Sequence, residues 1–160
     1  MKEKPERKEG GSQDAVQAAF RLLSVRQRSV RELELKLLQK GFDGDAVGKT
    51  IEYLLKAGLL DDERFARSLA ESRSRHKAWG PARIARDLAS RGLDESAVKS
   101  ALAGCAPEED SALEAYRRWL KRNSRETGPR AREKAFRHLR ARGFSTAAIM
   151  KALGGLPPDE

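Results

Sequence analysis

Histidine and carboxylate side chains are the first candidates for chemistry in this sequence, because they supply general bases and metal ligands. His76 and His138 are the two histidines; they stand 62 residues apart among arginines, with no nucleophile or paired carboxylate nearby. We therefore interpret both as solvated surface residues. Asp61, Asp62 and Glu63 form an acidic run that could hold a metal ion. Acids at the start of a helix also complement the helix dipole, and we favour that capping role.

The sequence lacks the short motifs that mark several common enzyme classes. It contains no G-x-x-x-x-G-K-[ST] phosphate loop, no H-E-x-x-H zinc motif and no G-x-S-x-G nucleophile turn. Its single cysteine, Cys105, allows neither an internal disulfide nor a cysteine-ligated zinc site. We therefore expect a protein that is not an enzyme and that uses no cofactor and no metal ion.

Positive charge points to a different kind of function. The 160 residues include 33 Lys and Arg against 24 Asp and Glu, and a net charge of +9 favours an anionic partner, with nucleic acid first. Eleven basic and two acidic residues lie between 117 and 142, and eight basic and two acidic residues lie between 64 and 91. A solvated helix face normally mixes both signs, so we interpret these segments as binding surfaces. The residues predicted to contact a partner or DNA are Arg73, Arg75, Lys77, Arg83, Arg86, Arg130, Lys134 and Arg137, of which the last three share one helical face.

The elements that carry these charges are indicated by a phrase that recurs at intervals of 51 residues. LLQKGFDGDAV begins at Leu37, LASRGLDESAV at Leu88 and LRARGFSTAAI at Leu139. In each copy a basic residue precedes a glycine, which is typical of a helix end, and a capping residue two positions later begins the next helix. The glycines are Gly41, Gly92 and Gly143, and the capping residues are Asp43, Asp94 and Ser145.

Each repeated turn joins the second and third helices of a three-helix unit, because a further amphipathic segment precedes every copy. The predicted fold is all-α, an elongated array of three tandem three-helix repeats, since a unit of about 50 residues buries little surface alone. The predicted repeats cover residues 12–60, 61–106 and 107–156, between a disordered tail at 1–11 and a short tail at 157–160. The sequence shows neither a bilayer-spanning apolar run nor a signal peptide, so we expect a cytoplasmic protein without membrane contact.

Two details of the sequence offer other modes of nucleic-acid binding. A helix, a glycine turn and a second helix also describe the helix-turn-helix, which reads DNA sequence. The helices after the first two turns open with acids, which phosphates repel, so only the third unit, with Ser145 and Lys151, escapes this objection. The two tryptophans are candidate stacking platforms for bases. We interpret Trp119 as a core residue, because it shares an apolar stripe with Tyr116, and leave both roles open for Trp79.

Four longer phrases occur in an order that is typical of one family. RQRSVRELELKLLQKGF begins at Arg26, LLDDERFARSLAESR at Leu59, GPARIARDLASRGLDESAV at Gly80 and LRARGFSTAAI at Leu139. Together they resemble the RecX regulatory proteins of bacteria over about residues 15–153. The departures are mild: Asp87 stands where a Glu is usual, and Arg91 where a Lys is usual.

This resemblance implies a regulator of the RecA recombinase. It implies a protein that lies in the groove of the RecA filament on DNA and modulates ATP hydrolysis, strand exchange and filament extension in recombination, DNA repair and the SOS response. We therefore expect the RecA filament and the backbone of single- or double-stranded DNA as partners, mainly inhibition as the outcome, and a monomer when the protein is free. The alternative is a non-sequence-specific DNA-binding protein that acts on recombination indirectly. A third hypothesis is a general helical scaffold.

Overall fold

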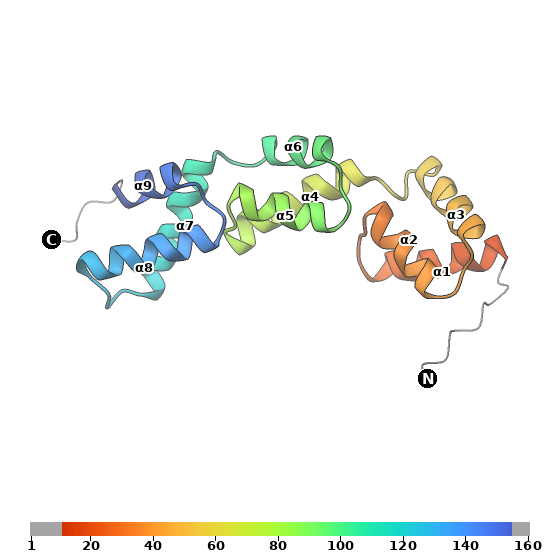
Figure 1. Cartoon of the computed structure of the whole chain (residues 1–160), viewed down its shortest axis with the longest axis horizontal. Helices are drawn as coiled ribbons and strands as arrows, with labels where there is room; N and C mark the ends of the chain where they lie inside the picture. The colour runs from red at the N-terminus through yellow and green to blue at the C-terminus, as the bar shows by residue number, and fades with distance from the viewer. Residues whose placement is uncertain (1–10, 155–160) are drawn as a thin grey trace. The chain divides into compact units, whose positions relative to one another are not determined.

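The computed structural model describes residues 11–154, and all regular structure within that range is helical (Figure 1). The helices of the first repeat are α1 (Ser12–Val25), α2 (Val30–Gln39) and α3 (Gly44–Lys56). Those of the second are α4 (Asp62–Lys77), α5 (Pro81–Ser90) and α6 (Glu95–Ala103), and those of the third are α7 (Glu108–Arg122), α8 (Gly128–Ala141) and α9 (Thr146–Gly154). The all-α fold of three tandem three-helix repeats is therefore confirmed. Of the predicted tails at 1–11 and 157–160, all but Gly11 lies outside the described residues.

The described residues form two compact units. One contains residues 11–65 together with Arg91–Asp94, and the other contains Ala66–Ser90 together with residues 95–154. The predicted repeat boundaries, after residues 60 and 106, fall in the connections between α3 and α4 and between α6 and α7. These boundaries, as limits of domains, and the elongation of the array stay predictions from the sequence.

The repeated phrase forms a left-handed glycine turn in all three copies. The φ values are 93°, 80° and 89° at Gly41, Gly92 and Gly143, a backbone region that glycine adopts without a steric penalty. At the third turn the N–H groups of Gly143 and Phe144 donate to the carbonyls of Arg140 and Leu139, which is the Schellman pattern that satisfies the last helical carbonyls. The prediction that a helix ends before each of these glycines is confirmed.

The residues predicted to start the third helix of each repeat stand at helix starts. The Asp43 Oδ1 atom accepts a hydrogen bond from the Ala46 N–H at 2.8 Å, and the Ser145 Oγ atom accepts one from the Ala148 N–H at 3.2 Å. Both are therefore confirmed as N-caps. In the second repeat, α6 begins at Glu95, directly after Asp94.

The 51-residue register also determines which side chains are buried. One matched set, at most 2% exposed, comprises Leu33, Ile84 and Ala135, and a second, fully buried, comprises Leu37, Leu88 and Leu139. Trp119 is buried in the core of the third repeat and stacks on Tyr116 with ring centroids 6.3 Å apart, which confirms its predicted core role. In the part of the chain that the structure describes, no helix combines the length and the apolar character needed to cross a bilayer.

Candidate basic interface

All eight basic residues predicted to contact a partner lie in the second compact unit. Helix α4 carries three of them, α5 two, and α8 the remaining three. Six have exposed side chains: Arg75, Lys77, Arg86, Arg130, Lys134 and Arg137. Arg73 and Arg83 are half-buried, so these two also contribute to the packing of the unit.

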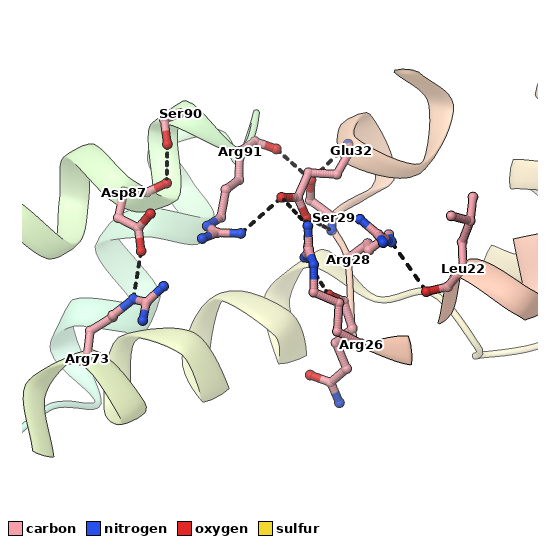
Figure 2. A network of polar contacts seen from close by, with 10 residues as sticks. Leu22, Arg26, Arg28, Ser29, Glu32, Arg73, Asp87, Ser90 and Arg91 are labelled. Carbon is pink, nitrogen blue, oxygen red and sulfur yellow. Dashed lines mark hydrogen bonds and ion pairs between the residues drawn. The ribbon is translucent and has the colours of Figure 1, made fainter. Parts of the chain in front are cut away.

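The half-buried pair contacts the tryptophan that lies between α4 and α5. The guanidinium carbons of Arg73 and Arg83 lie 4.9 and 4.2 Å from the centroid of the Trp79 ring, within the range of cation–π attraction. The Arg73 Nε atom also donates to Asp87 on α5 at 2.9 Å, as Figure 2 shows. Two guanidinium groups therefore already contact the Trp79 ring, which favours a structural role for it over an open stacking platform.

The exposed residues differ in how their charge is balanced. Arg75 pairs with Glu71 at 3.0 Å, Lys134 pairs with Glu126 at 2.8 Å, and Arg137 lies 3.9 Å from Glu133. Exposed pairs of this kind contribute little free energy, so an anionic partner can compete for these cations. For Lys77, Arg86 and Arg130, no carboxylate among residues 11–154 lies within 4 Å.

The start of α5 packs directly against the end of α8. The Gly80 N–H donates to the Arg142 carbonyl at 2.7 Å, and the Ala82 N–H donates to the Gly143 carbonyl at 3.2 Å. The approach is so close that a Cβ atom on Gly80 would lie 2.5 Å from the Gly143 carbonyl carbon. Because the Arg83 Nη1 atom donates to the Ala141 carbonyl at 3.3 Å, this junction brings Arg83 to the C-terminal end of α8, the helix that carries the other three cations.

The first unit contains a contact of the same kind at the same interval. The Ser29 Oγ atom donates to the Arg91 carbonyl at 2.5 Å, and Ser29 and Arg91 are 62 residues apart, as Gly80 and Arg142 are (Figure 2). Arg91 in turn donates to Glu32 at 2.9 Å. Burial alone raises the pKa of this carboxyl, but hydrogen bonds from Arg26 and the Ser29 N–H, with the charge of Arg91, lower it overall.

Two residues of the acidic run Asp61–Glu63 accept hydrogen bonds from backbone N–H groups at helix starts. The Asp61 Oδ1 atom accepts a hydrogen bond from the Arg64 N–H at 2.9 Å, which confirms the capping interpretation for this residue. The Asp62 Oδ1 atom instead accepts one from the Val30 N–H at 2.9 Å, in the first turn of α2. Burial raises the pKa of Asp62, and this hydrogen bond opposes the shift.

The same unit contains a second group of cations that was not predicted from the sequence. One cavity is lined by both histidines and by Arg118, Arg122 and Arg142. These three arginines lie in the basic segment 117–142, but none of them was among the residues predicted to contact a partner. His76 is exposed, as expected, but the prediction of a solvated surface residue is wrong for His138. The His138 side chain is half-buried, and its Nε2 atom accepts a hydrogen bond from the Arg142 Nε atom at 3.1 Å. The high density of basic residues between 117 and 142 was the feature of the sequence that could have indicated these three arginines.

Comparison with known proteins identifies the family of the chain. The model described as "RecX, first three-helix domain" matches residues 15–54, the second-domain model matches 61–102 and the third-domain model matches 107–153. The Regulatory protein RecX of Chlorobium limicola is 33% identical over 143 residues, which cover 88% of this chain and 87% of that protein. The Regulatory protein RecX of Stenotrophomonas maltophilia is 34% identical over 150 residues, with 92% and 90% covered.

Solved structures support the same fold. The crystal structure of RecX from Lactobacillus salivarius superimposes with a TM-score of 0.80 at 22% identity, over 91% of this chain and 96% of that one. A second crystal structure, of a regulatory protein RecX, superimposes with a TM-score of 0.74 over 87% of this chain. Together with the three matched domains, these relatives confirm the resemblance noted in the sequence, and the chain belongs to the RecX family of regulatory proteins.

Proposed function

We propose that this protein regulates RecA, mainly as an inhibitor, by binding in the groove of the RecA filament on DNA. There it modulates ATP hydrolysis, strand exchange and filament extension, with effects on recombination, DNA repair and the SOS response. Because RecA and its DNA lie in the bacterial cytoplasm, we place the activity there. The free protein is a monomer, and the binding involves no covalent chemistry.

The observation that carries this proposal is the set of exposed cations on α4, α5 and α8. Arg130, Lys134 and Arg137 lie on one face of α8, and all three side chains are exposed. Cations on such a surface can contact both acidic protein side chains and the phosphates of DNA, which are the two surfaces that a filament groove presents. Family membership supports RecA as the protein partner.

The test is the ATPase activity of RecA on single-stranded DNA, with and without this protein. The informative variant reverses three charges, Arg130→Glu, Lys134→Glu and Arg137→Glu. Since these side chains are exposed, we expect normal helicity and thermal stability but inhibition weakened by about tenfold or more, as each lost contact contributes about 1 kcal/mol or more.

A matched control reverses three exposed cations elsewhere, Arg21→Glu, Lys36→Glu and Lys99→Glu. Both variants fall from a net charge of +9 to +3, because each of the three reversals removes two charges. The control should inhibit RecA nearly as well as the unmodified protein. Equal inhibition by the two variants would remove the α8 face from the proposed site, and no inhibition by the unmodified protein would contradict the proposed function.

The alternative, a DNA-binding protein that affects recombination indirectly, is favoured by the same cations. It predicts that naked DNA binds as tightly as RecA-coated DNA and that both affinities fall equally with salt. Filament binding predicts tighter association with RecA-coated DNA at every salt concentration. Titrations of both substrates at several salt concentrations therefore separate the two functions.

A further inference from the structure

Six of the ten residues that line a cavity in the second unit are basic. It has a volume of about 430 Å³ and lies where the end of α4 meets α7 and α8. This volume is within the range of roughly 300–1,000 Å³ that is usual for small-molecule sites. Among the described residues that line it there is no Asp or Glu. Its basic lining residues are His76, Lys77, Arg118, Arg122, His138 and Arg142.

Two of the arginines are held in place by uncharged groups. The Arg118 Nη1 atom donates to the Arg75 carbonyl at 2.8 Å, and the Arg142 Nη1 atom donates to the Lys77 carbonyl. Carbonyls at the end of α4 therefore orient both guanidinium groups without adding a negative charge. A carboxylate does contact Arg118, since Glu114 accepts from its Nε atom at 3.0 Å, but that pair is exposed and weakly coupled.

The arginines in and around the cavity repel one another. Burial lowers the pKa of Arg142, and the charges of Arg83, Arg122 and Arg118 lower it further. Burial also lowers the pKa of His138, followed by the charges of Arg142 and Arg122. None of these contributions comes from a carboxylate, so a bound anion would relieve repulsion that the folded protein otherwise retains.

We propose that this cavity binds a phosphate-bearing anion, with phosphate oxygens contacted by the guanidinium groups of Arg118, Arg122 and Arg142. Guanidinium groups present paired N–H donors that match phosphate oxygens, and Lys77 adds charge at the rim. The phosphate can belong to a small anion such as a nucleotide or to the backbone of a DNA strand. This site goes beyond the proposed function, because its three arginines are not among the eight predicted contact residues and it does not require RecA.

The test is isothermal titration calorimetry of the full-length protein with pyrophosphate at constant ionic strength. The variant is Arg122→Gln, because Arg122 is exposed and no carboxylate among residues 11–154 lies within 4 Å of it. The matched control is Arg117→Gln, which removes the same charge from an exposed position on the same helix, outside the cavity. We expect one pyrophosphate per chain, with affinity reduced about tenfold by Arg122→Gln and unchanged by Arg117→Gln.

The proposal is overturned if the unmodified protein binds no pyrophosphate or if both variants lose affinity equally. Circular dichroism checks that Arg122→Gln is folded, and Lys77→Gln provides a second variant on another helix, with a smaller expected loss. Competition with a labelled single-stranded oligonucleotide identifies the source of the phosphate. Displacement by pyrophosphate assigns the site to the DNA backbone, and simultaneous binding assigns it to a small anion.

Discussion

Single residues in the basic segments have different roles despite their equal charge. Arg73 pairs with Asp87 and contacts the Trp79 ring, so its guanidinium group stabilises the connection between α4 and α5. Arg86 is exposed, and its Nε atom donates to the Ala82 carbonyl of its own helix, at 3.3 Å. Both arginines were predicted as binding residues because both lie in the basic segment 64–91, and the sequence does not distinguish them. Only the packing around Trp79 distinguishes a structural arginine from an available one.

Gly143, just beyond the end of α8, should tolerate substitution far less well than Gly128, the first residue of that helix. Gly143 and Gly128 both have positive φ values, 89° and 78°, so alanine at either position costs about 1–2 kcal/mol in backbone strain. A Cβ atom at Gly143 would also lie 2.5 Å from the Arg83 backbone nitrogen, whereas one at Gly128 meets nothing within 4 Å. We therefore expect Gly143→Ala to lower the free energy of unfolding by about 1–3 kcal/mol more than Gly128→Ala, measured by urea denaturation. Equal losses would contradict the close junction between α5 and α8.

The pKa of His138 predicts a pH-dependent loss of stability. Burial and the neighbouring arginines lower this pKa in the folded state, so the unfolded chain binds more protons at mildly acidic pH. The stabilising contribution is therefore complete above the ordinary histidine pKa of about 6.5 and is lost as the pH falls through the lower folded value. A His138→Gln variant keeps a hydrogen-bond acceptor for Arg142 but does not titrate. We expect the melting temperature of the unmodified protein to fall more between pH 7.5 and pH 5.5 than that of the variant; identical falls would exclude His138 as the cause.

At the scale of the elements, the helix ends could be predicted because their causes are local. Gly41 ends a helix through its own left-handed backbone conformation, and Asp43 caps the next helix by accepting a hydrogen bond from Ala46, three residues later. Such local partners can be recognised in the sequence. Contacts across repeats could not be predicted in this way. Ser29 reaches the Arg91 carbonyl and Asp62 reaches the Val30 N–H, and in both cases the partner is distant in the sequence. The 51-residue interval predicts that repeats exist, but it does not predict which atoms meet at their junctions.

Ser29 makes both a local capping bond and a bond to a residue that is distant in the sequence, so the contribution of the distant bond can be measured. Its Oγ atom accepts a hydrogen bond from the Glu32 N–H at 3.1 Å, as an ordinary N-cap, and also donates to the Arg91 carbonyl. Asp43 makes the capping bond at an exposed position. We expect Asp43→Ala to cost about 1 kcal/mol and Ser29→Ala about 2–3 kcal/mol in the free energy of unfolding, because the second loses a buried bond as well. Urea denaturation followed by circular dichroism measures both, and equal costs would show that the bond to Arg91 adds no stability.

At the scale of the whole molecule, the sign of the charge and its concentration in two segments could be predicted from the sequence. The cavity that basic residues of these segments line could not. The basic residues that line this cavity come from positions between 76 and 142, in or directly after three helices of two repeats. Their meeting depends on how the end of α4 packs on α7 and α8, and a helical periodicity does not contain that information. The cations of the α8 face lie on one helix, and for that reason the spacing alone could place them together.

The salt dependence of DNA binding provides a quantitative test of that face. For single-stranded DNA the logarithm of the affinity falls with the logarithm of the salt concentration, with a slope of about 0.7 per phosphate contacted. If Arg130, Lys134 and Arg137 each contact one phosphate, reversing all three to Glu should reduce the slope by about 2. Anisotropy of a labelled oligonucleotide measures the slope. The variant that reverses Arg21, Lys36 and Lys99 carries the same net charge as the α8 variant. It should lose some affinity because its long-range attraction to DNA is weaker, but its slope should stay the same. A slope that changes equally in both variants would assign DNA binding to net charge, and a slope unchanged in the α8 variant would place the phosphate contacts elsewhere.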